Sequence, residues 1–310
     1  MNVHDTWGLE PNKAEEWLGL IHDEICRHNV EMVKDWFHFI IYCISAKSDR
    51  IEDFERDFIK RLLSEGNNVI IVFTQCDCTS EENLLTRVNY LKGIGVDSKD
   101  IIRTCSVEKK LIGGKRTSEY GKEELLDRIQ RNFWKSICEK IPQIINDYAV
   151  SKIDDTTKGL KNYVEDNINF FNMHSGRKHL KMSDYCNRKY SECTKNIDKY
   201  AEDKLKEAVN YYVAVCGTFY PLVGNKNVDY RMQKVRKINF SMDFSDKLAE
   251  ILATIVMGLI PLVNLVVPWA AAELKQDEFK SSLDSVSEEL INSVNEICKE
   301  MYNYLCKLDV

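Results

Sequence analysis

The feature that most constrains the fold is the segment at residues 68–77, which reads NVIIVFTQCD. Its centre, residues 69–73, is an unbroken run of β-branched and aromatic side chains. Such a run is typical of a strand that is covered on both faces, as in a parallel sheet. Polar residues follow it at once, and open α/β sheets bind ligands just beyond the carboxyl ends of their strands. The sequence therefore predicts a buried strand that leads into a recognition loop.

Other segments of the first half alternate between strand and helix patterns. Residues 36–45 and 101–105 are short apolar runs, and we expect them to form strands. Apolar side chains recur at helical spacing over residues 11–29, 51–63 and 81–91. Strands that alternate with helices in this way predict an α/β domain.

The polar loop after the central strand reads Thr74-Gln75-Cys76-Asp77. It resembles the guanine-specificity motif of small GTP-binding proteins, which is usually N/T-K-x-D. The resemblance implies that the Asp77 carboxylate accepts two hydrogen bonds from the guanine ring, a strong and selective pairing. It also implies that Thr74 and Gln75 lie around the base, with Gln75 in the place of the family's lysine.

A second motif stands near the first residue, where Asp5-Thr6-Trp7-Gly8 matches D-x-x-G. It resembles the switch II motif of the same GTPases. In that family the Asp, here Asp5, reaches Mg²⁺ through a water, and the Gly8 N–H meets the γ-phosphate. Thr6 belongs to the same nucleotide-binding motif. Leu9 occupies the position where Ras-like proteins carry the glutamine that orients the attacking water.

A third motif follows the last predicted strand, where Ser106 and Val107 resemble the short loop whose backbone contacts guanine. The order of the three motifs resembles a TRAFAC-class GTPase of the Era-like or dynamin-like kind. The resemblance implies a truncated GTPase-like domain over residues 1–140. Its fold class would be α/β, an incomplete P-loop GTPase-like sheet with flanking helices. It also implies GTP or GDP as ligand, with Mg²⁺.

The phosphate loop G-x-x-x-x-G-K-S/T does not occur in the sequence. In the GTPase family this loop lies before D-x-x-G, so we expect either a chain shortened at its N-terminus or a pseudo-GTPase. No residue is assigned to catalysis, and the chain as given is expected to lack GTP hydrolase activity. The alternative function is a non-catalytic scaffold or a membrane-associated helical module.

Strand patterns nearly vanish in the second half, and residues 141–310 are predicted to form an all-α helical bundle. We expect Pro142 to kink or split the first helix. A charged stretch, residues 152–158, is interpreted as a linker, and a long amphipathic helix is predicted over 185–215. Residues 217–239 contain proline, glycine and basic residues, and we expect a connecting loop there.

Residues 251–272 carry no charge over 22 positions. A straight helix of that length would span roughly 33 Å, about the thickness of a bilayer's hydrocarbon core. Pro261 and Pro268 interrupt it, so a pair of short helices is favoured, either buried in the bundle or inserted into one leaflet, and a full span remains the third alternative. Residues 276–306 continue as a coiled-coil-like helix for the bundle, a partner or self-association.

Composition limits the remaining function classes. The net charge of −6 gives no electrostatic reason to expect nucleic-acid binding. Eleven cysteines without C-x-x-C pairs fit a reducing compartment. Several acidic residues among the first 30 argue against a signal peptide, so we expect a cytoplasmic protein, peripheral at the membrane if residues 251–272 insert. The leading hypothesis is a guanine-nucleotide-binding protein whose helical part engages a membrane or partner, and a membrane-permeabilising effector is a third reading.

Overall fold

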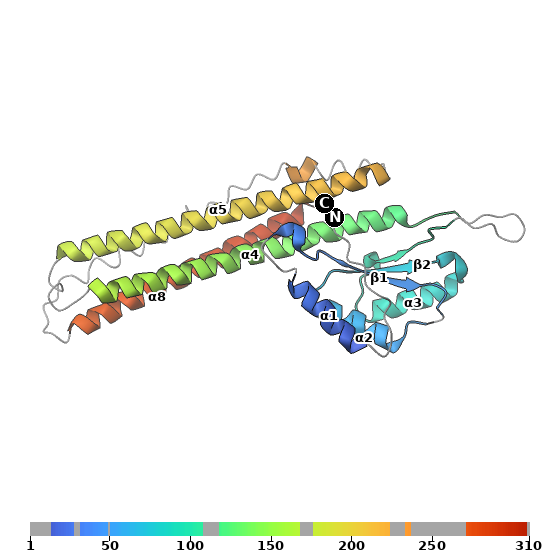
Figure 1. Cartoon of the computed structure of the whole chain (residues 1–310), viewed down its shortest axis with the longest axis horizontal. Helices are drawn as coiled ribbons and strands as arrows, with labels where there is room; N and C mark the ends of the chain where they lie inside the picture. The colour runs from blue at the N-terminus through green and yellow to red at the C-terminus, as the bar shows by residue number, and fades with distance from the viewer. Residues whose placement is uncertain are drawn as a thin grey trace, which may run out of the picture. The chain divides into compact units, whose positions relative to one another are not determined.

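The computed structural model describes residues 14–27, 32–48, 50–107, 118–167, 176–223, 233–236 and 271–308. This part of the chain is mostly helical and contains a three-stranded parallel sheet (Figure 1). Two compact units are present. The first, here called the sheet unit, comprises Met1–Ile137, Ala208–Lys237 and Val310. The second, the helical unit, comprises Cys138–Glu207 and Ile238–Asp309.

The sheet consists of β1 (Ile40–Ser45), β2 (Val69–Thr74) and β3 (Ile101–Arg103) in the order β1-β2-β3. β2 is central and parallel to both neighbours. All of its residues except the last are buried, which confirms the strand predicted from the apolar run. β1 begins at Ile40, later than expected, because residues 36–39, which follow a 3-10 turn at Val33–Asp35 named η2, form neither strand nor helix.

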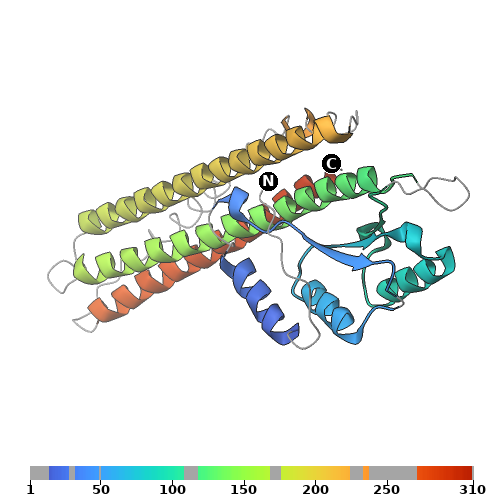
Figure 2. The ribbon, with the colours of Figure 1, turned by 45° about the vertical axis from the view of Figure 1, so that its right-hand side comes forward.

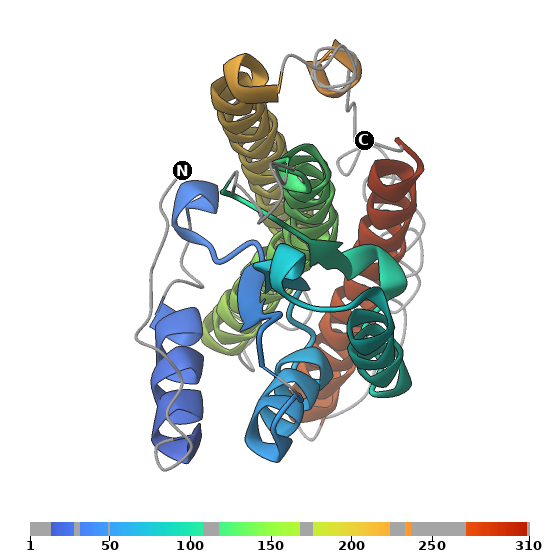
Figure 3. The same ribbon diagram turned by 90° about the vertical axis from the view of Figure 1, so that its right-hand side faces the viewer.

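Three helices accompany the strands: α1 (Ala14–Arg27), α2 (Asp53–Ser64) and α3 (Glu81–Gly93) (Figure 3). A reciprocal capping box of Glu52 and Glu55 starts α2. The Ser80 hydroxyl accepts a hydrogen bond from the Asn83 N–H and caps α3. The apolar faces of α2 and α3 pack on one face of the sheet, through Phe58, Ile59, Leu62, Leu84, Val88 and Leu91.

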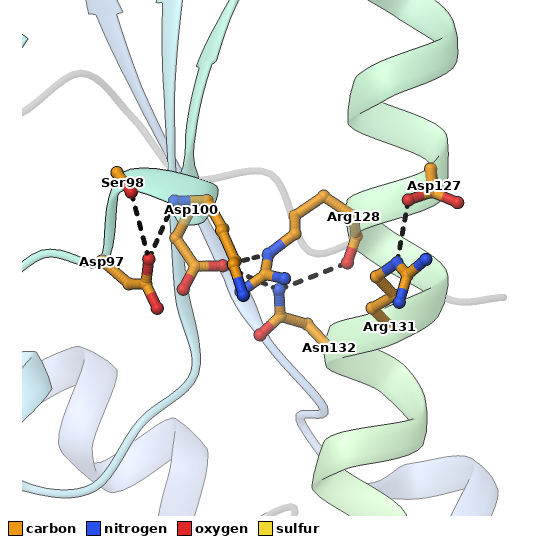
Figure 4. Close-up of polar contacts among 8 residues, drawn as sticks. Asp97, Ser98, Asp100, Asp127, Arg128, Arg131 and Asn132 are labelled. Atoms are coloured by element: carbon orange, nitrogen blue, oxygen red, sulfur yellow. Dashed lines mark hydrogen bonds and ion pairs between the residues drawn. The ribbon is translucent and has the colours of Figure 1, made fainter. Parts of the chain in front are cut away.

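A long helix, α4 (Lys122–Asn167), follows the sheet, and its first turns belong to the sheet unit. Asp100, in the 3-10 turn before β3 (η4, Ser98–Asp100), accepts hydrogen bonds from Arg128 Nε at 2.5 Å and Asn132 Nδ2 at 2.9 Å (Figure 4). The Arg128 and Asp100 side chains are only 17% and 15% exposed. This network holds α4 to the amino end of β3.

An aromatic cluster joins the end of α5 (Gly176–Val223) to the rest of the sheet unit. The Phe133 ring stacks on Tyr212 with 5.4 Å between centroids, and it meets the His38 ring edge-on at 4.4 Å. His38 Nε2 donates to the carbonyl of Val33 at 3.0 Å, and its Nδ1 lies 3.3 Å from Ser136 Oγ. These contacts assign His38 a packing role.

The helical unit contains the remainder of α4 and α5 together with α8 (Ala271–Lys307), and the three run side by side in Figures 1 and 2. Each presents a stripe of buried side chains at helical spacing. The stripes contain Ile141, Ile145, Ala149, Ile153, Leu160 and Val164 of α4, Cys186, Tyr190, Cys193, Ile197, Ala201 and Leu205 of α5, and Leu283, Val286, Leu290, Val294, Ile297 and Met301 of α8. This coarse layout, a small α/β region and helical elements beyond it, agrees with the expected fold class.

Three expectations for the helical part need correction. α4 continues through Pro142, so the proline does not split the helix, and Ile141 and Ile145 on either side of it are fully buried. The charged stretch 152–158 is helix rather than linker, since Ile153 and Thr157 continue the buried stripe. The loop expected from residue 217 begins later, because α5 extends to Val223.

Candidate functional site

The candidate site lies at the carboxyl edge of the sheet, where β2 ends. Gln75 directly follows the strand and adopts a left-handed conformation with φ of 58° and ψ of 37°. Such backbone is uncommon for a residue other than glycine. It turns the chain into a single 3-10 turn, named η3, at Cys76–Cys78, where the Cys78 N–H donates to the Gln75 carbonyl at 3.0 Å. Thr74 and Asp77 are half-buried on the two sides of this bend, while Gln75 itself is exposed.

The turn after β3 lies directly beside it. The Cys76 N–H donates to the Thr104 carbonyl at 3.2 Å, and the Thr104 N–H donates to the Phe73 carbonyl at 2.8 Å. Ser106 and Val107 follow in this second turn and are exposed, Val107 by 57%. The structure therefore brings Thr74, Gln75, Asp77, Ser106 and Val107 to one edge of the sheet.

A short return strand stabilises the second turn. Cys105 and Tyr120 exchange backbone hydrogen bonds of 3.1 and 3.0 Å as an isolated antiparallel bridge. Gly121 comes next, with φ of +85°, and a Cβ there would lie 2.0 Å from the Arg103 carbonyl oxygen. Only glycine fits this approach, and it allows α4 to start against the end of β3.

The end of β1 completes the edge through Ser45, whose hydroxyl donates to Gln75 Oε1 at 3.4 Å. The loop after β1 is held by Arg87 of α3, a residue that sequence reasoning missed. Its guanidinium donates to the carbonyls of Ala46 at 2.9 Å and Ser48 at 2.5 Å, and only 4% of Arg87 is exposed. One signal was available, because Arg87 lies within the apolar stripe of α3, where an arginine needs buried partners.

The electrostatics of the edge are set by thiols, a phenol and one carboxylate. Burial raises the pKa of the Cys76 thiol. The pKa of Tyr120 is also raised, chiefly by burial, next by the Cys76 and Cys105 thiols, and more weakly by the Asp77 carboxylate. Asp77 therefore lies close enough to Tyr120 for its charge to be felt there. The edge can offer the Asp77 carboxylate beside the Cys76 thiol and the Tyr120 phenol.

The remaining predicted site residues, Asp5, Thr6 and Gly8, lie outside the described residues. The expectation of Mg²⁺ rests on Asp5 and stays a prediction. Within the described ranges, no group of three His, Cys, Asp or Glu side chains is placed to hold a metal ion.

The apolar segment at 251–272 also lies outside the described residues, apart from its last two positions, which begin α8. In the part of the chain that the structure describes, every helix is too short or too polar to cross a membrane. Residues 276–306 lie within α8.

Comparison with known proteins found no matching family model, no matching curated protein and no matching solved structure.

Proposed function

We propose that the chain is a guanine-nucleotide-binding protein whose base site is the carboxyl edge of the sheet around Asp77. The observation that carries the proposal is the backbone tie between the two turns, from Cys76 N–H to the Thr104 carbonyl. It ties the turn that carries Asp77 to the turn that leads to the exposed Ser106. A planar base between the two turns meets a charged acceptor and backbone groups at once.

The chemistry of guanine favours this ligand over other bases. Its N1–H and exocyclic amine are two adjacent donors, and an ionised Asp77 is an acceptor with two oxygens. Adenine presents an acceptor at N1 and has no exocyclic donor beside it at C2, so it cannot pair with a carboxylate in this way. The left-handed Gln75 directs the chain so that Asp77 follows within the same short turn. Ser45 restrains the Gln75 side chain next to the site.

The test is displacement of a fluorescent GDP analogue from the full chain by GDP, ADP and xanthosine diphosphate. We expect GDP to compete best. Asp77→Asn should weaken GDP by about 10- to 100-fold, which corresponds to the roughly 1.5–3 kcal/mol of a charged hydrogen bond. The same variant should improve xanthosine diphosphate, because the amide N–H₂ can donate to the xanthine oxygen that replaces the guanine amine.

Asp97→Asn is the matched control. Asp97 precedes the amino end of β3, and its carboxylate accepts from the Lys99 N–H in the exposed η4 turn. We expect this variant to bind GDP as the unaltered chain does. Equal displacement by GDP and ADP, or equal effects of Asp77→Asn and Asp97→Asn, would refute the assignment of the base site.

In this proposal the helical unit engages a protein partner or a membrane. A partner surface is favoured on α8, where Tyr302 and Tyr304 are 41% and 43% exposed. Tyrosine is enriched at protein interfaces because it combines apolar area with a polar tip. Sedimentation of the chain over a range of concentrations tests self-association, and vesicle flotation tests the membrane alternative.

A further inference from the structure

Two thiols from different helices of the helical unit are in contact. Cys138 of α4 and Cys306 of α8 share a side-chain hydrogen bond. Cys138 is 1% exposed, whereas Cys306 is exposed. The pair therefore joins a buried sulfur to one that solutes can reach.

The contact belongs to a regular antiparallel pairing of α4 with α8, which lie side by side in Figures 1 and 2. Glu165 pairs with Lys280, and Lys161 pairs with Asp284. Moving four residues back along α4 thus corresponds to moving four residues forward along α8. Two ion pairs in the same register fix how the helices face one another.

The same register continues to the two thiols. Fourteen residues further back on α4 and fourteen further forward on α8, Asp147 lies near Cys298. Burial, and then the Asp147 carboxylate, raise the pKa of the Cys298 thiol to about 12. Nine residues further back on α4 is Cys138, and eight further forward on α8 is Cys306. The cysteines therefore occupy matching levels of facing helices.

The surroundings assign different roles to the two sulfurs. The pKa of the Cys138 thiol is raised, chiefly by burial and then by the nearby Cys306 thiol and Glu139 carboxylate. A buried thiol of raised pKa reacts slowly with oxidants from solution. Cys306 shares a further hydrogen bond with the Tyr302 side chain. The exposed Cys306 is therefore the sulfur that an oxidant attacks, and Cys138 is the partner that resolves the product.

We propose that Cys138 and Cys306 form a reversible disulfide site that peroxides oxidise, joining α4 covalently to α8. In the first step the Cys306 sulfur attacks one peroxide oxygen, an S–O bond forms and the O–O bond breaks, and the departing hydroxide takes the Cys306 proton and leaves as water. In the second, the Cys138 sulfur gives up its proton and attacks the Cys306 sulfenic acid. The S–S bond forms and the S–O bond breaks as a second water leaves. The two thiols together lose two electrons, and hydrogen peroxide is reduced to two waters.

The expected consequence is a more stable helical unit. The bond closes a chain segment that starts in α4, includes α5 and ends near the end of α8. Closing a long loop restricts the unfolded chain more than the folded one. Oxidation should therefore raise the unfolding temperature of the helical unit, and dithiothreitol should reverse the rise.

The test treats the full chain with graded hydrogen peroxide, alkylates remaining thiols in acidic denaturant, and maps the unreduced digest by mass spectrometry. We expect a Cys138–Cys306 linked peptide that dithiothreitol removes. Cys306→Ser should abolish it and should leave Cys138 fully alkylated. Cys298→Ser, which changes a buried cysteine of the same helix, should leave the linked peptide in place.

Peptide mapping of the oxidised, unaltered chain tests the proposed disulfide even if a variant folds poorly. Cys78 is exposed in the sheet unit and serves as an internal reference for oxidation. The proposal is overturned if Cys78 is consumed while Cys138 and Cys306 both remain alkylated. It is also overturned if Cys306 ends as sulfinic acid or as a bridge between two chains.

Discussion

Removing the Asp100 carboxylate tests how the start of α4 is held to the sheet. This carboxylate accepts from Arg128 Nε at 2.5 Å and from Asn132 Nδ2 at 2.9 Å (Figure 4). Asp100→Ala would leave the Arg128 guanidinium without its carboxylate in a site where that side chain is 17% exposed. Asn132 keeps one bond, to the Arg128 carbonyl at 3.2 Å. The main cost is therefore the unpaired charge.

Breaking a buried ion pair from one side costs about 3–5 kcal/mol, and the residual exposure of this pair places it near the lower end, about 3 kcal/mol. With a urea dependence of about 2 kcal/mol per molar, the unfolding midpoint should fall by roughly 1.5 M. Tryptophan fluorescence reports the change, because Trp36 and Trp134 are buried in the sheet unit.

Asp127→Ala is the matched control on the same helix. Asp127 pairs with Arg131 at 2.9 Å one turn away, and the two side chains are 37% and 40% exposed. Ion pairs of this kind contribute about 0.5 kcal/mol or less. If both variants lost equal stability, the Asp100 network would be no more than another surface pair, and the reasoning about α4 would be refuted.

Three further variants test a backbone conformation and a protonation state. Gly121→Ala should destabilise the chain by more than about 2 kcal/mol, because φ is +85° and the new Cβ would meet the Arg103 carbonyl. Gly159→Ala, within α4, places its Cβ in open space and should stabilise the chain by about 0.5–1 kcal/mol. Equal melting temperatures of the two variants would contradict this reasoning. Burial raises the pKa of Tyr190 from 10.0 to about 12, and its hydroxyl lies 2.9 Å from Thr157 Oγ1. The protonated hydroxyl therefore contributes its full stability below pH 10.0, and that contribution is lost as the pH rises through about 12. Tyr190→Phe should unfold with a flatter pH dependence over this interval, and parallel profiles would contradict the assignment.

Local patterns in the sequence predicted the elements that local physics determines. The apolar run at 69–73 became the buried β2, and the polar residues after it became a turn at the carboxyl edge. The helices predicted over 51–63 and 81–91 became α2 and α3 within two residues at each end. Spacing of apolar side chains decides such elements, and it is visible without the fold.

Features that depend on distant partners escaped sequence reasoning. Asp100 and Arg128 are polar residues 28 positions apart, and only the docking of α4 beside β3 turns them into a buried pair. Arg87 likewise reaches carbonyls about 40 positions away. Pro142 was expected to kink or split its helix, and the helix is not split there, because burial of the residues beside the proline outweighs the lost backbone hydrogen bond. Tertiary contacts override local propensity in each case.

The candidate site was predictable in part. The residues 74–77 and 106–107 could be named from their places after strands, and the structure brings them to one edge. The left-handed Gln75 and its contact with Ser45 could not be foreseen, because the pairing of β1 with β2 is a long-range property.

The central claim is tested most directly by calorimetric titration of GDP into the full chain and into Asp77→Ala, with magnesium present. The account predicts a measurable heat with one site per chain and an affinity at least about tenfold weaker in the variant, since a charged hydrogen bond is lost. Circular dichroism should show both proteins equally folded. Absence of binding by the folded, unaltered chain, or equal binding by the variant, would contradict a guanine site at Asp77.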